Sequence, residues 1–189
     1  LFRKITKKLH KSRDVVEFSK KFLELSPLYA ALNDPNNDYF DDNNVKEKLD
    51  NLNTMKAKIF YPLILALVAH DFEFNDVKKV IDLIETFYLR NIVSKSNPNK
   101  FEVFFAELAY SISNKEIINT KDILIRINEN IITDEQFCLF FNDFAPNRPI
   151  AKYVLREIND YQEKEIQIIR DNYLLNLEHI MPQNPRKND

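Results

Sequence analysis

Apolar residues near the start of the chain recur at intervals of three and four, which is the spacing of one face of an α-helix. The first run of this kind begins at Val15 and ends near Ala31, so we predict a helix there. A segment rich in Asn and Asp, from Asn33 to Asn44, then breaks the pattern and contains Pro35. Such composition is typical of a mobile surface loop.

The helical spacing returns after this loop and continues through most of the chain. The spacers between successive apolar runs are short, and no repeat of fixed length is present, which favours a packed bundle over a solenoid. The expected helices are a short one through Val45, Leu49 and Leu52, a buried one from Ile59 to His70 with Pro62 in or near its first turn, and further ones over 77–88, 101–112, 123–130, 137–141 and 150–161.

Residues that cap helices support several of these boundaries. Small polar side chains accept hydrogen bonds from the free amides of a first turn, and proline is tolerated there. We expect Asn75 and Asn97 to cap the helices that follow them, and Thr120 to open another. Thr133, with a glutamine three residues on, predicts a capping box, and Pro149 starts the last helix.

The sequence therefore predicts an all-α fold, an irregular bundle of seven or eight helices. Residues Tyr173 to Ile180 fit a helix poorly, and we predict a short β-strand there. An isolated strand is unstable, so its partner is expected beyond Asp189. This divides the chain into a helical domain, residues 1–172, and the start of a second domain, residues 173–189.

Composition excludes several classes of site. The chain has 189 residues, 44% of them hydrophobic, which is enough to bury a core. It contains no glycine, so glycine-rich nucleotide-binding loops are excluded within it. Its one cysteine, Cys138, can form neither an internal disulfide nor a cysteine-rich zinc site. We expect Cys138 to be a small core residue, in a protein of the reducing cytoplasm.

The ends of the chain and its hydropathy add two expectations. The longest apolar stretch, Phe60 to Ala69, covers about half of the roughly 20 residues that span a membrane, so we expect no membrane association. The chain starts at Leu1 with neither a methionine nor a signal peptide. We expect both ends to continue in a longer protein.

Positive charge is concentrated at the start of a chain whose net charge is only −2. Lys7, Lys8, Lys11 and Arg13 are candidates for contacts to a nucleic-acid backbone, with affinity that falls as salt rises. The alternative is a solvated helix face with no ligand.

The clearest candidate for chemistry is a compact group near the C-terminus. His179 can take a proton from water near pH 7, Glu178 can hold a divalent ion, and Pro182 can fix the turn between them. Adjacent residues of a strand point to opposite faces, so the first two would serve as base and ligand separately. The alternative is a turn histidine without a catalytic role, and His70 and His10 are expected to be structural or solvated.

Residues Leu177 to Asn184, LEHIMPQN, resemble the opening of the His-x-x-Pro nuclease domain of GmrSD-like, modification-dependent (type IV) restriction enzymes. The preceding Arg148-Pro149 and the segment Tyr153 to Ile158 resemble the final helix before that nuclease. In these enzymes an N-terminal ParB-like domain that uses nucleotide is followed by a helical region and then by an HNH-like nuclease. The resemblance therefore implies that this chain is the helical connector with the first nuclease motif.

The resemblance also implies roles for single residues. His179 would be the general base against a phosphodiester, Glu178 a ligand of a divalent metal, with Mg²⁺ expected in the full-length enzyme, and Pro182 would shape the loop. The partners would be DNA, the ParB-like domain and the rest of the nuclease, acting in phage defence. The remaining metal ligands have no counterpart before Asp189, so the fragment itself is expected to hold no cofactor and to be inactive. The alternative function is a helical protein-interaction module with no catalytic role.

Overall fold

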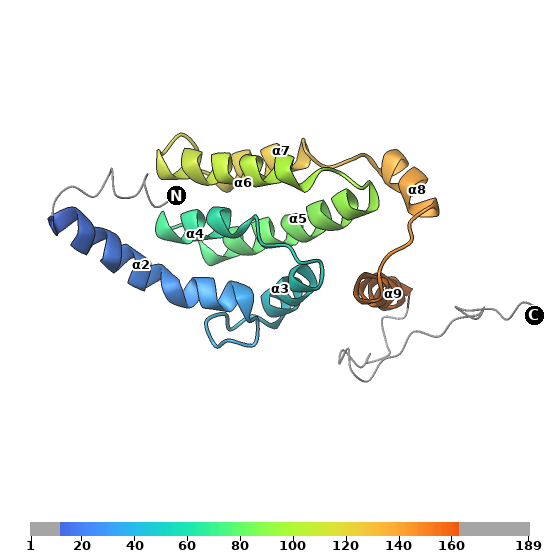
Figure 1. The fold of residues 1–189 in the computed structure, drawn as a ribbon, viewed down its shortest axis with the longest axis horizontal. Helices are drawn as coiled ribbons and strands as arrows, with labels where there is room; N and C mark the ends of the chain where they lie inside the picture. The colour runs from blue at the N-terminus through green and yellow to red at the C-terminus, as the bar shows by residue number, and fades with distance from the viewer. Residues whose placement is uncertain (1–11, 163–189) are drawn as a thin grey trace, which may run out of the picture. The chain divides into compact units, whose positions relative to one another are not determined.

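The computed structural model describes residues 12–162 and confirms the all-α prediction (Figure 1). Within these residues there are eight α-helices and no β-strand. The helices are α2 (Ser12–Asn33), α3 (Asn43–Thr54), α4 (Tyr61–Ala69), α5 (Phe74–Val93), α6 (Pro98–Ser113), α7 (Thr120–Asn128), α8 (Asp134–Asn142) and α9 (Arg148–Gln162). None of them is both long and apolar enough to cross a membrane.

The chain forms two compact units that divide between Asp143 and Phe144. Helices α2 to α8 belong to the first unit, and α9 belongs to the second. The predicted strand over 173–180 and the predicted domain boundary after residue 172 both lie outside the described residues.

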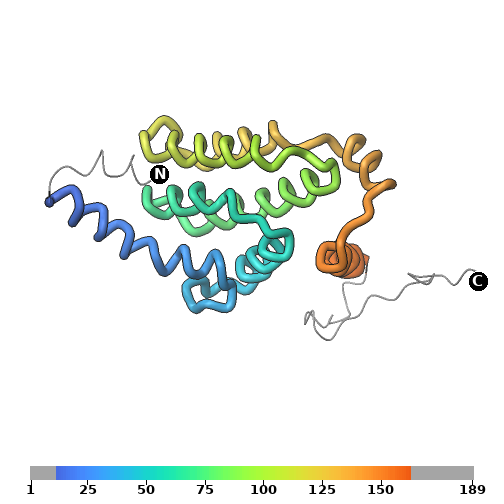
Figure 2. The backbone as a smooth tube through the Cα atoms, viewed as in Figure 1, coloured from blue at the N-terminus to red at the C-terminus, as the bar shows by residue number. Residues whose placement is uncertain are grey.

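The core of the first unit is built around α4 and α5. Helix α4 packs against α2 and α6, while α5 packs against α3, α7 and α8. Figure 2 shows α4 and α6 side by side although α5 separates them in the sequence. Helix α4 is apolar on every side, as its sequence YPLILALVA requires of a central helix, and Pro62 lies in its first turn as predicted.

Aromatic side chains fill the space between α5 and α6. The ring of Phe87 meets those of Phe101 and Phe105 edge-on, with centroids 4.8 and 5.2 Å apart. Edge-to-face contacts of this kind are favourable beyond the area that they bury. These phenylalanines are buried as the helical spacing predicts.

Helix α2 contains a proline, Pro27, in its interior. Proline has no amide hydrogen, so the carbonyl of Leu23, four residues earlier, loses its usual helical donor. The hydroxyl of Ser26 donates to that carbonyl at 2.9 Å instead. The helix therefore continues to Asn33 without leaving this acceptor unsatisfied.

Some predicted caps are confirmed and others are wrong. Asn97 caps α6, accepting from the amide of Asn99, and Thr133 forms the capping box of α8. Asn75 does not cap α5, because that helix already begins at Phe74 and Glu73 precedes it without a side-chain cap. The cap of α7 is Asn119 rather than Thr120. The predicted start is two residues late for α5 and one residue late for α7, because more than one residue near each start could precede the first turn.

Four helices end in a residue with positive φ although the chain has no glycine. The residues that follow the C-caps of α3, α4, α5 and α6 have φ between 53° and 61°. A left-handed residue at this position lets the helix end in a tight turn, and glycine is the usual choice. Here the positions are filled by Lys56, Asp71, Lys95 and Lys115.

Two burial predictions need correction. Cys138 is exposed, because α8 docks on α5 through the neighbouring Phe137, whose ring lies 5.1 Å from the guanidinium carbon of Arg90. The next residue along the helix is turned by about 100° from Phe137 and lies at the surface. The Asn- and Asp-rich segment from Asn33 to Asn44 is also more than a surface loop, since Phe40 within it is only 3% exposed.

Candidate functional site

The predicted catalytic group, Glu178, His179 and Pro182, lies outside the described residues, as do Lys7, Lys8 and Lys11. Arg13 is described and lies exposed in the first turn of α2. The structure therefore brings none of these predicted site residues together, and the nuclease site and the basic track stay predictions.

His70 occupies the structural position expected of it, at the C-terminal end of α4. It is the C-cap residue, and its amide donates to the carbonyls of Ala66 and Leu67 at 3.1 and 3.3 Å. Across residues 12–162, no group of three or more His, Cys, Asp or Glu side chains is arranged to hold a metal ion.

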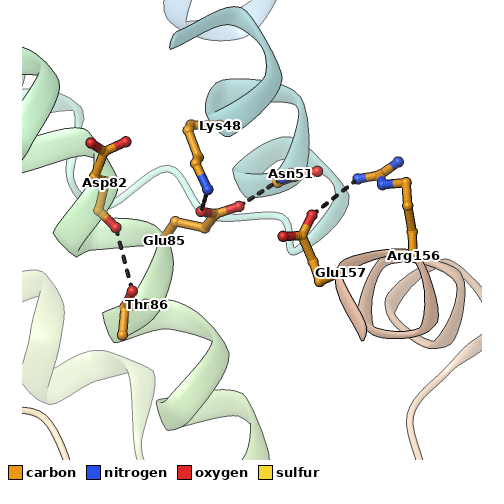
Figure 3. A network of polar contacts seen from close by, with 7 residues as sticks. All are labelled: Lys48, Asn51, Asp82, Glu85, Thr86, Arg156 and Glu157. Carbon is orange, nitrogen blue, oxygen red and sulfur yellow. Dashed lines mark hydrogen bonds and ion pairs between the residues drawn. The ribbon is translucent and has the colours of Figure 1, made fainter. Parts of the chain in front are cut away.

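A buried carboxylate, Glu85, is the most enclosed charged group among the described residues of the first unit. The residue is 5% exposed on α5, and two side chains from α3 bind it (Figure 3). Lys48 Nζ lies 2.5 Å from Oε2, and Asn51 Nδ2 donates to Oε1 at 2.6 Å. Because both carboxylate oxygens are bonded to α3, this group ties two helices together rather than presenting a reactive acid.

The sequence around Glu85 indicates that this residue is buried. The residue lies within the apolar run of α5, one position after Ile84 and four after Ile81, both of them fully buried. A charged residue at a core position is expected to have a partner of opposite charge. The identity of that partner could not be read from the sequence, since α3 lies more than thirty residues earlier.

A cleft of about 320 Å³ opens in the first unit where the α3–α4 loop meets the end of α5 and the start of α6. We call it the lysine-rimmed cleft. Its apolar lining includes the buried rings of Phe87 and Phe101, and three lysines stand around it. The lining residues are Met55, Lys56, Lys58, Ile59, Phe87, Tyr88, Asn91, Ile92, Lys95, Ser96, Pro98 and Phe101.

The three lysines of the cleft differ in what their ammonium groups contact. Lys58 donates to Asn33 Oδ1 at 3.0 Å. Lys56 and Lys95 are exposed, and neither pairs with a carboxylate among residues 12–162. Both lie directly after a helix C-cap, in the left-handed conformation.

Tyr88 contributes its ring to the cleft and buries its hydroxyl. The hydroxyl lies near the backbone of Ile59 but makes no hydrogen bond of ordinary geometry. Burial raises the pKa of the Tyr88 hydroxyl well above its usual value of 10. The phenol is therefore neutral at all physiological pH values and adds no charge to oppose the lysines.

A second pocket, of about 430 Å³, has a different character. Four aromatic rings and one acidic side chain line it, and no lysine or arginine is among the described lining residues. The lining consists of Tyr39, Phe40, Asp41, Val68, Phe72, Phe74 and Val77.

Helix α2 carries an apolar stripe on its exposed side. Phe22 and Leu23 are 70% and 72% exposed, and Val15, Val16 and Phe18 are exposed as well. The positions Val15, Phe18, Phe22, Leu25 and Tyr29 alternate in steps of three and four, the spacing of a coiled-coil seam. The spacing of these residues predicted the helix, and the structure leaves much of its apolar face exposed.

Comparison with known proteins leaves the family of this chain open. No family model, no curated protein and no solved structure matches it. Over residues 12–162 the structure shows an all-α fold, pockets that differ in their chemistry, and an exposed apolar face on α2.

Proposed function

We propose that this chain is the helical connector and first nuclease motif of a modification-dependent DNA endonuclease. The observation that carries the proposal is the segment LEHIMPQN, residues 177–184, which follows the helical part of the chain. The resemblance calls for a last helix that contains Arg148-Pro149 and the segment from Tyr153 to Ile158. Helix α9, Arg148–Gln162, spans these residues and so supports the proposal.

The chemistry follows from the two residues at the centre of the motif. His179 would accept a proton from water near neutral pH, and Glu178 would help to hold a divalent metal, with Mg²⁺ expected. A hydrolytic metal stabilises the charge that develops on the phosphate oxygens. Glu178 and His179 lie outside residues 12–162, so the metal and its ligands are proposed from the sequence. The cytoplasmic setting is part of the same proposal.

The test is DNA cleavage by the full-length polypeptide with Mg²⁺ and nucleotide. Glucosylated, methylated and plain plasmids are compared for the unaltered protein, His179→Ala and His70→Ala. We expect cutting of a modified plasmid to fall at least about 100-fold in His179→Ala, the loss typical of a removed general base.

The variant His70→Ala is the matched control, because His70 is a helix C-cap with no proposed role in cleavage. We expect it to cut as the unaltered protein does. Undiminished cutting by His179→Ala, or no cutting of any plasmid by the unaltered protein, would contradict the proposal.

A second candidate function is a helical protein-interaction module with no catalytic role. The exposed apolar stripe of α2 favours it, because single exposed apolar side chains are common but a contiguous stripe marks a contact surface. The two candidate functions differ in whether DNA cleavage depends on His179.

A further inference from the structure

The lysine-rimmed cleft combines an apolar floor with a positively charged rim. Its floor includes Phe87, 1% exposed, and Phe101, 7% exposed, with Ile92 and Pro98 beside them. Concave sites that are mostly apolar, with a few polar groups at fixed positions, are typical of small-molecule binding. At about 320 Å³, the cleft lies at the small end of that range and suits one compact ligand.

The charged side chains around the cleft are all positive. Lys56, Lys58 and Lys95 line the cleft, and none of its described lining residues is acidic. Positive charges gathered around an apolar surface repel each other, and an anion seated between them would relieve that repulsion. The rim therefore complements a ligand with an apolar body and a negative group.

The backbone fixes where two of these lysines stand. Lys56 follows the C-cap of α3, and Lys95 follows the C-cap of α5, with φ of 58° and 53°. A lysine near a helix C-terminus is favourable in itself, because the end of the helix dipole is negative. Lys115 has the same position after α6 and the same backbone conformation but does not line the cleft, so it separates the two explanations.

We propose that the lysine-rimmed cleft binds a small organic anion with a flat apolar body, such as an aromatic carboxylate. The ring system would lie against the accessible apolar lining, Ile59, Ile92 and Pro98, above the buried phenylalanines, and the carboxylate would lie between Lys56 and Lys95. This inference is independent of the proposed nuclease function.

Naphthoate is the probe, and naphthalenemethanol, which has the same rings without the charge, is its neutral counterpart. Both are titrated into the isotope-labelled 189-residue chain while its amide NMR spectrum is recorded. We expect saturable shifts at cleft residues such as Ile92 and Ser96, with naphthoate binding about fivefold more tightly than the alcohol, the effect of two exposed ion pairs.

Three variants locate the effect. The double variant Lys56→Gln/Lys95→Gln should lower the affinity for naphthoate about fivefold and leave that for the alcohol unchanged. Lys115→Gln should change neither affinity. Ile92→Trp, which places a large ring in the cleft, should abolish the binding of both probes while the amide signals of α7 stay in place.

Four results would overturn the proposal. They are equal affinities for the two probes, an equal loss for Lys115→Gln, shifts that follow the exposed stripe of α2 instead of the cleft, and the absence of saturable shifts with naphthoate.

Discussion

Residues in the left-handed conformation are the clearest local cost in this chain. A residue with a Cβ atom loses roughly 1–2 kcal/mol there, because Cβ approaches the following carbonyl oxygen. This strain is present at four positions, each directly after a helix C-cap: Lys56, Asp71, Lys95 and Lys115. Each of these residues could therefore be replaced by glycine without loss of the turn.

We predict that Lys115→Gly raises the free energy of unfolding by about 0.5–1 kcal/mol, because the glycine removes the strain and part of that gain is lost to greater freedom in the unfolded chain. Urea unfolding measures the change. The control is Ala106→Gly, at an exposed position inside α6, which should lose about 1 kcal/mol. If both variants had a lower free energy of unfolding, the side chain of Lys115 would stabilise the fold by more than its backbone strain destabilises it.

Asp42 combines two roles that depend on its charge. Its Oδ1 accepts from the amides of Asn44 and Val45 at the start of α3, and its Oδ2 lies 2.8 Å from Lys78 Nζ. The hydrogen bond from Lys78, with those from the two amides, holds the pKa of Asp42 below its ordinary value of 3.8. The folded state therefore binds this proton less readily than the unfolded state does.

A carboxyl group with a lowered pKa stabilises the fold above its unfolded pKa, and this contribution is lost as pH falls through the folded pKa. We predict that Asp42→Asn, which keeps a capping oxygen but cannot ionise, is less stable than the unaltered protein at about pH 7. The difference should shrink as the pH falls below the ordinary pKa of 3.8, because the carboxyl group is then increasingly protonated. Urea unfolding across this range measures the difference, and Asp50→Asn, an exposed position on the same helix, is the control. A constant difference at every pH would contradict the prediction.

At the scale of whole helices, the contact between α3 and α5 depends on polar as well as apolar groups. Val45, Leu49 and Leu52 of α3 are fully buried, and Lys48 and Asn51 bind Glu85 of α5 beside them. A buried carboxylate that loses a cationic partner is strongly destabilised, because water cannot replace the partner.

We predict that Lys48→Met lowers the free energy of unfolding by about 2 kcal/mol, somewhat below the usual loss for a fully buried pair because Lys48 is partly exposed. Lys46→Met, on the same helix, should change stability by less than about 0.5 kcal/mol. Thermal or urea unfolding distinguishes the two, and equal effects would show that the Lys48–Glu85 pair contributes nothing of its own.

The helix boundaries show what a local pattern predicts well. Asn97 and Thr133 cap the helices assigned to them, because a capping side chain bonds to amides two or three residues away. The predicted cap at Asn75 is wrong for an equally local reason, since the helix already begins at Phe74. Glu73, Phe74 and Asn75 offer similar starts, and small differences in packing choose between them.

For the protein as a whole, helix α2 is enclosed only at its C-terminal end. Leu28, Ala31 and Leu32 at its C-terminal end are fully buried, whereas Phe22 and Leu23 are mostly exposed. The exposed Val15, Phe18 and Phe22 have the spacing of a coiled-coil seam, with Leu23 next to it, and such a seam pairs with another helix of similar pattern. A second copy of α2 provides such a helix.

We predict that the 189-residue chain associates with itself as its concentration rises, and that Phe22→Ser/Leu23→Ser weakens this association. Sedimentation velocity measures it. Leu139→Ser removes another exposed apolar side chain, 67% exposed on α8, and should leave association unchanged. Identical sedimentation of the unaltered protein and the double variant would show that the stripe does not pair with itself.

Helical spacing, proline positions and caps act over a few residues, so they were enough to predict the fold class and most of the helices. Packing between helices set the other features: it left Cys138 and Phe22 exposed, paired Glu85 with Lys48, and brought Lys56 and Lys95 to one cleft. These outcomes depend on which helix faces meet. These contacts between helices join residues tens of positions apart in the sequence. Their contribution to stability depends on how the side chains pack, which no local sequence pattern contains.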